Sequence, residues 1–368
     1  MDGQTPKAKR EGIREKAVVA VLAAVLAIGL FAVIRDNRCP LAPRTAEPGL
    51  VAGDPGASGT ADEGLADGGR ISSLLYAEPV TENPDQPGGQ AAREAVEKLI
   101  TEQKFEAAAA ECARMREDAR KSGDARLWTW TLIRESQLRT SLHGYETAVR
   151  FFKDEAWPDS PLERDMLDLF YANSLVTYYH AYSWDISRRE RVEAKGPIDL
   201  KTWTRDRIFD EAWQALGRVW QDRERLAGRT AGEFPDFWSP GDYPAGVRDT
   251  LRDAVVYLLA GTLSDTTFWT PRQSNETWLV DLPGLLAKAG KTSAGSAAGI
   301  LASTSVHPIE KVAALLGEHE SWSRRSGRPA AALEARFQFV TALYVAFDSE
   351  DNRVLIRKHL TSFLASNR

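Results

Sequence analysis

The fold is decided by the stretch from Phe105 to Val149, FEAAAAECARMREDARKSGDARLWTWTLIRESQLRTSLHGYETAV, in which one motif occurs twice. FEAA at Phe105–Ala108 and YETA at Tyr145–Ala148 each open a predicted helix, and the two starts lie forty residues apart. An aromatic-Glu-x-Ala start with a period of about 34 to 47 residues is typical of tetratricopeptide-type (TPR) helical hairpins. Small residues are also needed wherever any two helices approach closely, so two copies leave both explanations open.

Two helical hairpins can be built outward from these starts. Ala91–Asp124 has a turn signal at Gln103–Phe105 and a stop signal at Gly123, and Ala125–Trp157 repeats the design with Gly144 at its turn. Downstream, apolar residues at spacings of three and four predict six further helices: Pro161–Ser183, Asp199–Ala227, Leu251–Leu263, His307–Trp322, Arg328–Phe347 and Asp351–Ala365. No run of alternating strands appears. We therefore predict an all-α domain of stacked antiparallel helical hairpins, TPR-like and superhelical.

Three of these helices have a clear apolar face. On the Pro161–Ser183 helix it consists of Leu162, Met166, Leu169, Ala172, Val176 and Tyr179. On the Asp199–Ala227 helix it consists of Ile208, Phe209, Ala212, Trp213, Leu216, Val219 and Trp220, and on the Arg328–Phe347 helix of Leu333, Phe337, Val340, Tyr344 and Phe347. Asp199 or Thr202 is expected to cap the second of them. The segments Phe234–Gly246 and Thr266–Ser296 are expected to be irregular.

The N-terminus is expected to anchor the chain in a membrane. Residues 1–16 are basic and precede an uninterrupted apolar run, AVVAVLAAVLAIGLFAVI, at residues 17–34. A helix of that length extends for about 27 Å, close to the ~30 Å hydrocarbon thickness of a bilayer. We predict a cytoplasmic tail (1–16), a transmembrane helix (17–34), a flexible Gly/Ala/Pro-rich linker (35–89) and an extracytoplasmic α-helical domain (90–368). A cleaved signal peptide is the alternative.

Composition argues against several classes of function. The net charge of −5 is mild and no basic block follows residue 16, so a nucleic-acid-binding surface is not expected. Cys39 and Cys112 cannot form a disulfide framework or a CxxC metal site, and two free thiols are favoured over a single bridge. The histidines form no HExxH zinc motif, and no GxSxG elbow occurs: His143, His180, His307, His319 and His359. We expect no metal, no cofactor and no catalytic residue.

The run YYHAYSWDISRRERVEAKGPIDLKTW, Tyr178–Trp203, is the strongest candidate for a site because it combines aromatic, acidic and basic side chains. Within it His180 and Asp185 resemble a catalytic pair, but the sequence supplies neither a third group nor an oxyanion donor. We interpret the run as a helix end, an exposed charged loop that offers a contact surface, and the start of the next helix. The eleven tryptophans of the chain indicate thick aromatic packing, with a carbohydrate-binding groove as the alternative.

Two acidic groups and one glycine-rich loop also resemble parts of a site. Asp165 and Asp168 resemble paired carboxylates, but their place beside an apolar stripe favours a solvated face. The acidic residues of Asp348–Asp351 lie at a helix start, where the helix dipole accounts for them. AGKTSAG at Ala289–Gly295 contains Gly-Lys-Thr but lacks the upstream glycine and the preceding strand of a phosphate-binding loop.

A further pattern is the order of several aromatic-containing segments. A helix rich in aromatic residues ends at Trp184, an Asp-Leu at Asp199 and a Trp at Trp203 precede the next helix, and a later Leu-x-Asp helix leads to Trp269. This order, over about Ala91–Ala365, resembles the helical N-terminal region of bacterial alpha-2-macroglobulin-like proteins. No single motif in it is a signature of that family.

The resemblance implies a bacterial cell-envelope protein, single-pass in the inner membrane, with its N-terminus in the cytoplasm and its bulk in the periplasm. Members of the family are protease inhibitors that entrap proteases, many through a Cys-x-Glu-Gln thioester. Here Cys112 lies in ECARM and Cys39 in RCPLA, so the thioester is absent, as are the β-sandwich macroglobulin domains.

We therefore expect a non-catalytic module that binds protein partners in the envelope, either a chain with macroglobulin domains or a protease. One alternative is an unrelated TPR-like scaffold in envelope assembly. Another is a helical glycan-active enzyme that uses aromatic clefts with acids nearby.

Overall fold

A computed structural model describes residues 87–189, 199–234, 237 and 243–366. The predicted basic tail (1–16), transmembrane helix (17–34) and nearly all of the linker lie outside these residues. Helix α3 already begins at Pro87, inside the segment predicted as linker. None of the helices formed by the described residues combines the length and the apolar character that a membrane crossing requires.

Both predicted hairpins at the start of the domain are confirmed. Helices α3 (Pro87–Thr101) and α4 (Phe105–Ser122) form the first, and α5 (Ala125–Ser141) and α6 (Tyr145–Asp154) form the second. Gly123 ends α4 in the left-handed conformation at φ 74°, where a residue without Cβ meets no steric penalty. The stop signal read from the sequence therefore acts as the helix C-cap.

Helix α7 (Pro161–Ile186) is surrounded on nearly all sides. Every residue from Asp165 to Val176 is buried, because α5, α6 and α8 (Arg205–Gln221) pack around it. The single apolar stripe predicted for this helix was therefore too narrow. The backbone leaves helical geometry at Tyr182, whose ring packs against Tyr178.

The start of α8 differs from its prediction. Asp199 caps a separate short 3-10 helix, η1 (Leu200–Thr202), and the cap of α8 is Thr204, whose Oγ1 accepts a hydrogen bond from the backbone N–H of Arg207. Most of the predicted apolar face of α8 is confirmed as buried, with Ala215 in addition. A four-residue helix, α9 (Arg223–Leu226), follows.

The segment predicted to be irregular from Thr266 to Ser296 consists instead of short helices. After η2 (Ala231–Glu233) and α10 (Leu251–Ser264) come η3 (Thr266–Phe268), α11 (Pro271–Glu276), η4 (Thr277–Leu279), α12 (Leu282–Lys288) and α13 (Ala294–Ala302). Capping side chains start four of them: Asp265, Thr270, Asp281 and Ser293. The polar residues that suggested a loop are therefore helix caps.

The last three helices are α14 (Pro308–Arg325), α15 (Pro329–Ala346) and α16 (Glu350–Ser366). The face predicted for α15 was wrong in part, because Leu333 is exposed while Ala332, Ala335 and Phe339 are buried. Helix α15 packs tightly on α14, and small side chains allow two helix backbones to approach closely. The alanine-containing face of α15 is therefore the one that is buried against α14.

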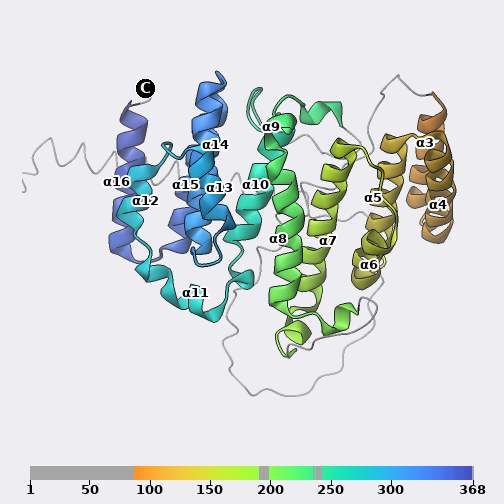
Figure 1. Cartoon of the computed structure of the whole chain (residues 1–368), viewed down its shortest axis with the longest axis horizontal. Coiled ribbons are helices and arrows are strands. Elements are labelled where there is room, and N and C mark those ends of the chain that lie inside the picture. Colours follow the sequence, from red (N-terminus) through yellow and green to blue (C-terminus); the bar gives the residue numbers. More distant parts are fainter. Residues whose placement is uncertain (1–86, 190–198, 235–236, 238–242, 367–368) are drawn as a thin grey trace, which may run out of the picture.

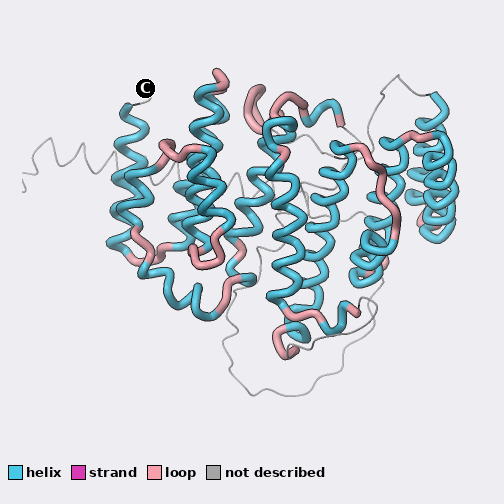
Figure 2. Tube along the Cα trace, in the orientation of Figure 1, coloured by secondary structure: helices cyan, strands magenta, loops and turns pink. Residues whose placement is uncertain are grey.

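The helices follow one another along the long axis of the molecule. Figure 1 shows α3 and α4 at one end and α12 and α16 at the other, and most packing contacts join helices that are close in sequence. The described residues form no strand, only one isolated bridge between Thr230 and Thr250 (Figure 2). The all-α class is therefore confirmed.

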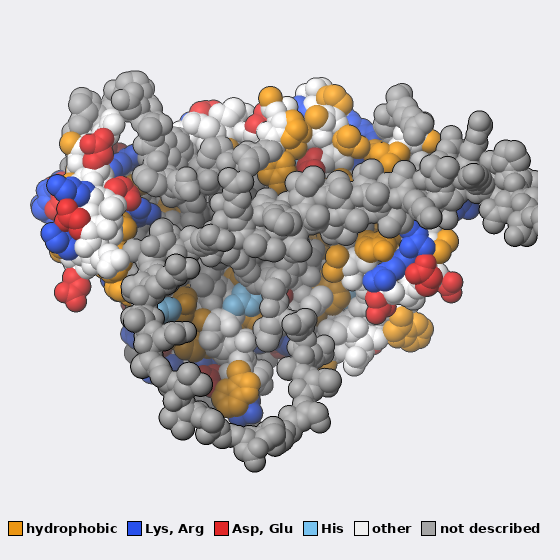
Figure 3. All heavy atoms as spheres, turned by 180° about the vertical axis from the view of Figure 1, so that it is seen from behind, with side chains coloured by type: hydrophobic (Ala, Val, Ile, Leu, Met, Phe, Trp, Pro, Cys, Tyr) orange, Lys and Arg blue, Asp and Glu red, His pale blue; other side chains and the backbone are white. Residues whose placement is uncertain are grey.

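The end formed by α3 and α4 carries mixed charges. Figure 3 shows basic and acidic side chains together at this end of the molecule. On α4 they form ion pairs along the helix, such as Arg114 with Glu111 and Asp118, and Arg120 with Glu117. The charged side chains of this face are paired along the helix and mostly exposed to solvent.

Candidate functional site

The carboxylates of Asp165 and Asp168 are buried, so their interpretation as a solvated face was wrong. Arg218 donates two hydrogen bonds to Asp168, at 2.6 and 3.0 Å, and Arg225 donates one to Oδ2 of Asp165 at 2.7 Å. The arginines come from α8 and α9. The acidic pair therefore fastens α7 to the next two helices, and its partners were hidden from the sequence because they lie 50 and 60 positions away.

Burial changes the protonation of this pair. It raises the pKa of Asp165 to about 7, against the attraction of Arg225, and it also raises the pKa of Asp168. A carboxyl with a raised pKa is one feature of a general acid. Here each carboxyl is engaged by an arginine that crosses from a neighbouring helix, which is what a structural tie requires.

His180 and Asp185 do not form a pair. Nε2 of His180 lies 3.0 Å from Oδ2 of Asp265, outside hydrogen-bond geometry, whereas Asp185 is exposed. Burial opposes ionisation of Asp265, but His180 and Thr267 outweigh it and hold the pKa of this carboxyl below its usual range. The histidine therefore joins the end of α7 to η3.

The run from Tyr178 to Trp203 forms the junction that its sequence indicates, as far as it is described. The hydroxyl of Tyr178 donates to the backbone carbonyl of Leu200, and the Arg189 guanidinium donates to the same carbonyl and to that of Trp203. Trp184 is 65% exposed, and the Arg188 guanidinium stacks 3.6 Å from its ring centroid. The charged loop at 190–198 lies outside the described residues.

The remaining sequence candidates have structural roles. Gly290, in the Gly-Lys-Thr loop, lies against the Glu320–Arg336 ion pair, where an added Cβ would come within 2.7 Å of Oε1 of Glu320. The acidic residues at 350 and 351 occupy the first turn of α16, as the dipole argument predicts. Burial raises the pKa of the Cys112 thiol to about 12, so this thiol is unreactive, and Cys39 lies outside the described residues.

Sequence reasoning missed a buried ionic network around α14. Glu318 accepts two hydrogen bonds from Arg252, and both side chains are inaccessible to solvent. Asp253 accepts from the Arg328 guanidinium and lies 3.1 Å from Nε2 of His319. The triplet Glu-His-Glu at 318–320 was a possible signal, but a polar triplet in a helix normally indicates a solvated face.

A further polar feature is one face of α7. Asn173, Thr177 and His180 lie at spacings of four and three and share this face, which we call the α7 polar ridge. Asn173 is 9% exposed, yet its Oδ1 has no hydrogen-bond partner among the described residues, and the same holds for Oγ1 of Thr177. Buried polar atoms normally have partners, so two unsatisfied neighbours indicate a position that a water or a ligand group occupies.

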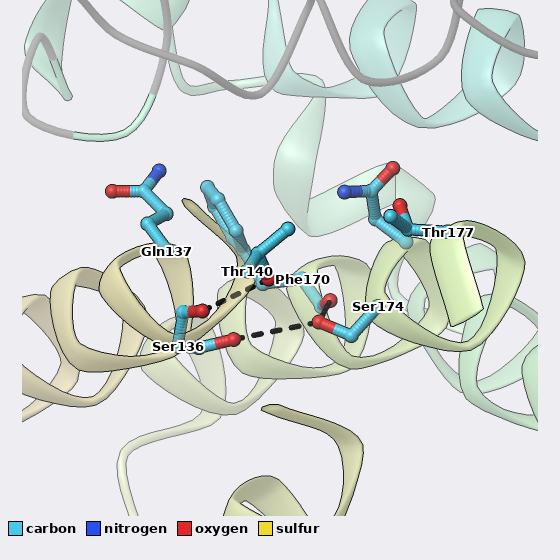
Figure 4. Close-up of a pocket in the computed structure, with 7 residues that line it drawn as sticks. Ser136, Gln137, Thr140, Phe170, Ser174 and Thr177 are labelled. Carbon is cyan, nitrogen blue, oxygen red and sulfur yellow. Dashed lines mark hydrogen bonds between the residues drawn. The ribbon is translucent and has the colours of Figure 1, made fainter. Parts of the chain in front are cut away.

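A small cleft opens beside this ridge, between α5 and α7. Its volume is about 10 Å³, and its lining includes Asn173 and Thr177 from α7 with Gln137 and Thr140 from α5. Figure 4 shows Gln137 and Thr177 pointing to the same side of the two helices. On the α5 wall the polar groups are satisfied: Thr140 Oγ1 donates to the Ser136 carbonyl, and Gln137 accepts from an arginine. Hydrogen-bonding capacity is therefore left over on the α7 wall.

A space of this size holds about one water molecule. It does not enclose a cofactor or a substrate, and no cluster of metal-binding side chains forms among the described residues. The cleft can instead receive a single hydrogen-bonding group presented by a molecule that lies across its mouth. Comparison with known proteins finds no matching family model, no matching curated protein and no matching solved structure.

Proposed function

We propose that this chain is a non-catalytic interaction module that binds protein partners in a bacterial cell envelope. It is anchored in the inner membrane through residues 17–34 and faces the periplasm with its helical domain. The helical domain would form the TPR-like stack of hairpins expected from the sequence. Its role would be that of the helical N-terminal region of alpha-2-macroglobulin-like protease inhibitors, which the sequence resembles.

The observation that carries the proposal is the α7 polar ridge. Asn173 and Thr177 each keep a buried oxygen without a partner in a cleft too small to enclose a reactant. Leaving such an oxygen unsatisfied costs about 1–3 kcal/mol, which a partner group can recover on binding. The buried acids of the described residues pair with arginines from other parts of the fold, which supports binding over catalysis.

Site-specific photo-cross-linking in intact cells tests this proposal. A photoreactive amino acid at Gln137, on the open side of the cleft, is expected to give discrete protein adducts in the envelope. The matched control carries the same group at Thr361, an exposed position of α16 far along the stack. Identical adducts from both positions, or none from Gln137, would contradict the proposal.

The membrane anchor is tested separately. The full chain is expected to remain with the membrane pellet after alkaline carbonate treatment. An added protease is expected to digest the helical domain once the outer membrane is opened, while the inner membrane is still sealed. Release of the chain by carbonate, or protection of the domain in such cells, would contradict the anchored, periplasm-facing arrangement.

A further inference from the structure

We infer that the α7 polar ridge binds the main chain of an extended peptide segment in the protein partner, with Asn173 as its central hydrogen-bonding residue. This inference rests on the proposed function as a protein-binding module. It adds the chemical class of the ligand, which is an unfolded stretch of polypeptide recognised through its backbone amides.

The geometry of Asn173 is the first step. Its side chain is about nine-tenths buried, it lines the cleft, and its Oδ1 has no partner among the described residues. A carboxamide offers both an acceptor and two donors, and a half-turn of the group exchanges them. Such a group can accept from the N–H or donate to the C=O of a peptide unit, which presents both.

The size of the cleft is the second step. At about 10 Å³ it admits one small polar group and excludes a whole side chain. A backbone N–H from a chain lying over the mouth meets this limit, because its bulk stays outside. Thr177 stands one turn further along α7 and its oxygen is also unsatisfied, so the same face carries a second hydrogen-bonding group.

The ridge also has a length suited to an extended chain. From Asn173 to His180 it covers seven residue-to-residue steps of helix, or about 10 Å at 1.5 Å per step. An extended peptide advances about 3.3 Å per residue, so roughly three residues span it. Beyond the kink at Tyr182, the exposed Trp184 ring with Arg188 stacked on it provides a surface for one side chain of the same segment.

N-methylated peptides provide the decisive test, since N-methylation removes main-chain donors and keeps the side chains. The probes are a pool of fluorescent 12-residue peptides of random sequence and the same pool with N-methylated amides. Fluorescence anisotropy with the full chain in detergent micelles is expected to detect binding of the first pool and at least tenfold weaker binding of the second. Equal binding of the two pools would overturn the inference.

Paired variants locate the contact. Asn173→Leu is expected to weaken binding of the unmethylated pool about tenfold, and Thr177→Val about three- to tenfold, as the loss of one hydrogen bond each. Thr361→Val on α16, far from the cleft, is the matched control, because its hydroxyl already bonds within its own helix, and binding should stay within twofold of the unmodified chain. Circular dichroism checks that each variant folds. The comparison of the two peptide pools uses the unmodified chain, so it remains valid if a variant fails to fold.

The outcomes separate this inference from the proposed function. If the unmodified chain binds neither pool at 1 mM peptide, the cleft holds ordered water only and the inference fails. Should Gln137 still give its own cross-linked partners in that case, the binding function survives with a folded partner surface. If the peptides and the cross-linking both fail, the proposed function fails as well.

Discussion

At the scale of single residues, three consecutive titratable side chains of α14 lie inside the protein. Glu318 and His319 are fully inaccessible and Glu320 is 1% exposed. Each carboxylate is matched by a buried arginine, Arg252 for Glu318 and Arg336 for Glu320. A buried charge is tolerated when it is paired and hydrogen-bonded, so the stability of this region depends on keeping the pairs complete.

Removing one partner of the Arg252–Glu318 pair is expected to be costly. Glu318→Gln leaves the fully buried guanidinium of Arg252 with one carboxylate among the described residues, that of Glu224, whose side chain is 63% exposed. We expect the free energy of unfolding to fall by about 3–5 kcal/mol, the usual cost of a broken buried pair. Urea denaturation of the full chain in detergent, followed by tryptophan fluorescence, measures this change.

The matched control is Glu276→Gln, which breaks the exposed ion pair with Arg272 on α11. Exposed pairs contribute about 0–1 kcal/mol, so the control should unfold almost as the unmodified chain does. A loss below 1 kcal/mol for the change at Glu318 would mean that the network adds little to stability.

Asp165 predicts a dependence of stability on pH. Its pKa is raised from 3.8 to about 7 by burial, so between these values the folded state holds a proton that the unfolded state has released. The contribution of Asp165 to the free energy of unfolding should therefore fall as pH rises from about 4 to about 7. Asp165→Asn, which stays neutral, should flatten this slope and gain roughly 2–4 kcal/mol over the unmodified chain at pH 8.

Unfolding measured between pH 4.5 and 8 tests this expectation. The range avoids the opposite contribution of Asp253, because its lowered pKa adds stability that is present above its ordinary value of 3.8 and lost at lower pH. Asp159→Asn, at a fully exposed carboxylate, is the control and should leave the slope unchanged. An unchanged slope in the Asp165 variant would show that this carboxyl is ionised in the folded protein.

At the scale of elements, the connections between helices depend on a few backbone positions. Gly290, between α12 and α13, has φ 67°, and an added Cβ would lie 2.5 Å from the Arg336 guanidinium. Gly123 has a similar φ of 74° but nothing within 4 Å of an added Cβ. An alanine at either position would have an unfavourable left-handed backbone conformation, but only an alanine at position 290 would also clash with neighbouring side chains. Comparing the two substitutions therefore separates the two costs.

The Gly123→Ala change should cost about 1–2 kcal/mol, the penalty of a left-handed alanine. Gly290→Ala should lose a further 1–3 kcal/mol, because it also displaces the buried Glu320–Arg336 pair. Thermal or urea unfolding of the two full-length variants gives the comparison. Equal losses would mean that the ion pair moves aside at no cost.

Much of the element level could be predicted from sequence. The hairpin turns, the Gly123 stop and Pro308 at the start of α14 were readable because each acts within a few residues. The cap of α8 and the short helices after Thr266 were missed. Several polar residues in each segment could have capped a helix, and only the backbone geometry shows which of them does. For α15 the apolar period was ambiguous, and contact with α14 decided which face is buried.

At the scale of the whole molecule, the stack is unevenly supported. Helix α14 contacts α10, α12, α13 and α15, whereas α3 at one end packs mainly on α4. Local opening requires the least free energy where few buried contacts are lost. Stability should therefore rise from the α3 end towards α14.

Hydrogen exchange measured by mass spectrometry checks this gradient. Backbone amides in the middle of α14 are expected to exchange slowest, at rates set by global unfolding, and those of α3 at least tenfold faster. Helix α10 is the internal reference, since it packs directly on α14. Uniform protection from α3 to α14 would indicate that the stack unfolds as one cooperative unit.

The sequence by itself determined the helical class and the order and approximate bounds of the long helices. These properties depend on apolar periodicity and on capping residues, which act over a few positions. Only the tertiary structure decided which charged residues lie inside, because the partner of Asp165 is 60 positions away and that of Arg252 is 66. The α7 polar ridge could also be recognised only in the tertiary structure. Asn173 and Thr177 have no distinguishing pattern in the sequence, and it is the surrounding helices that bury their oxygens and leave them without partners.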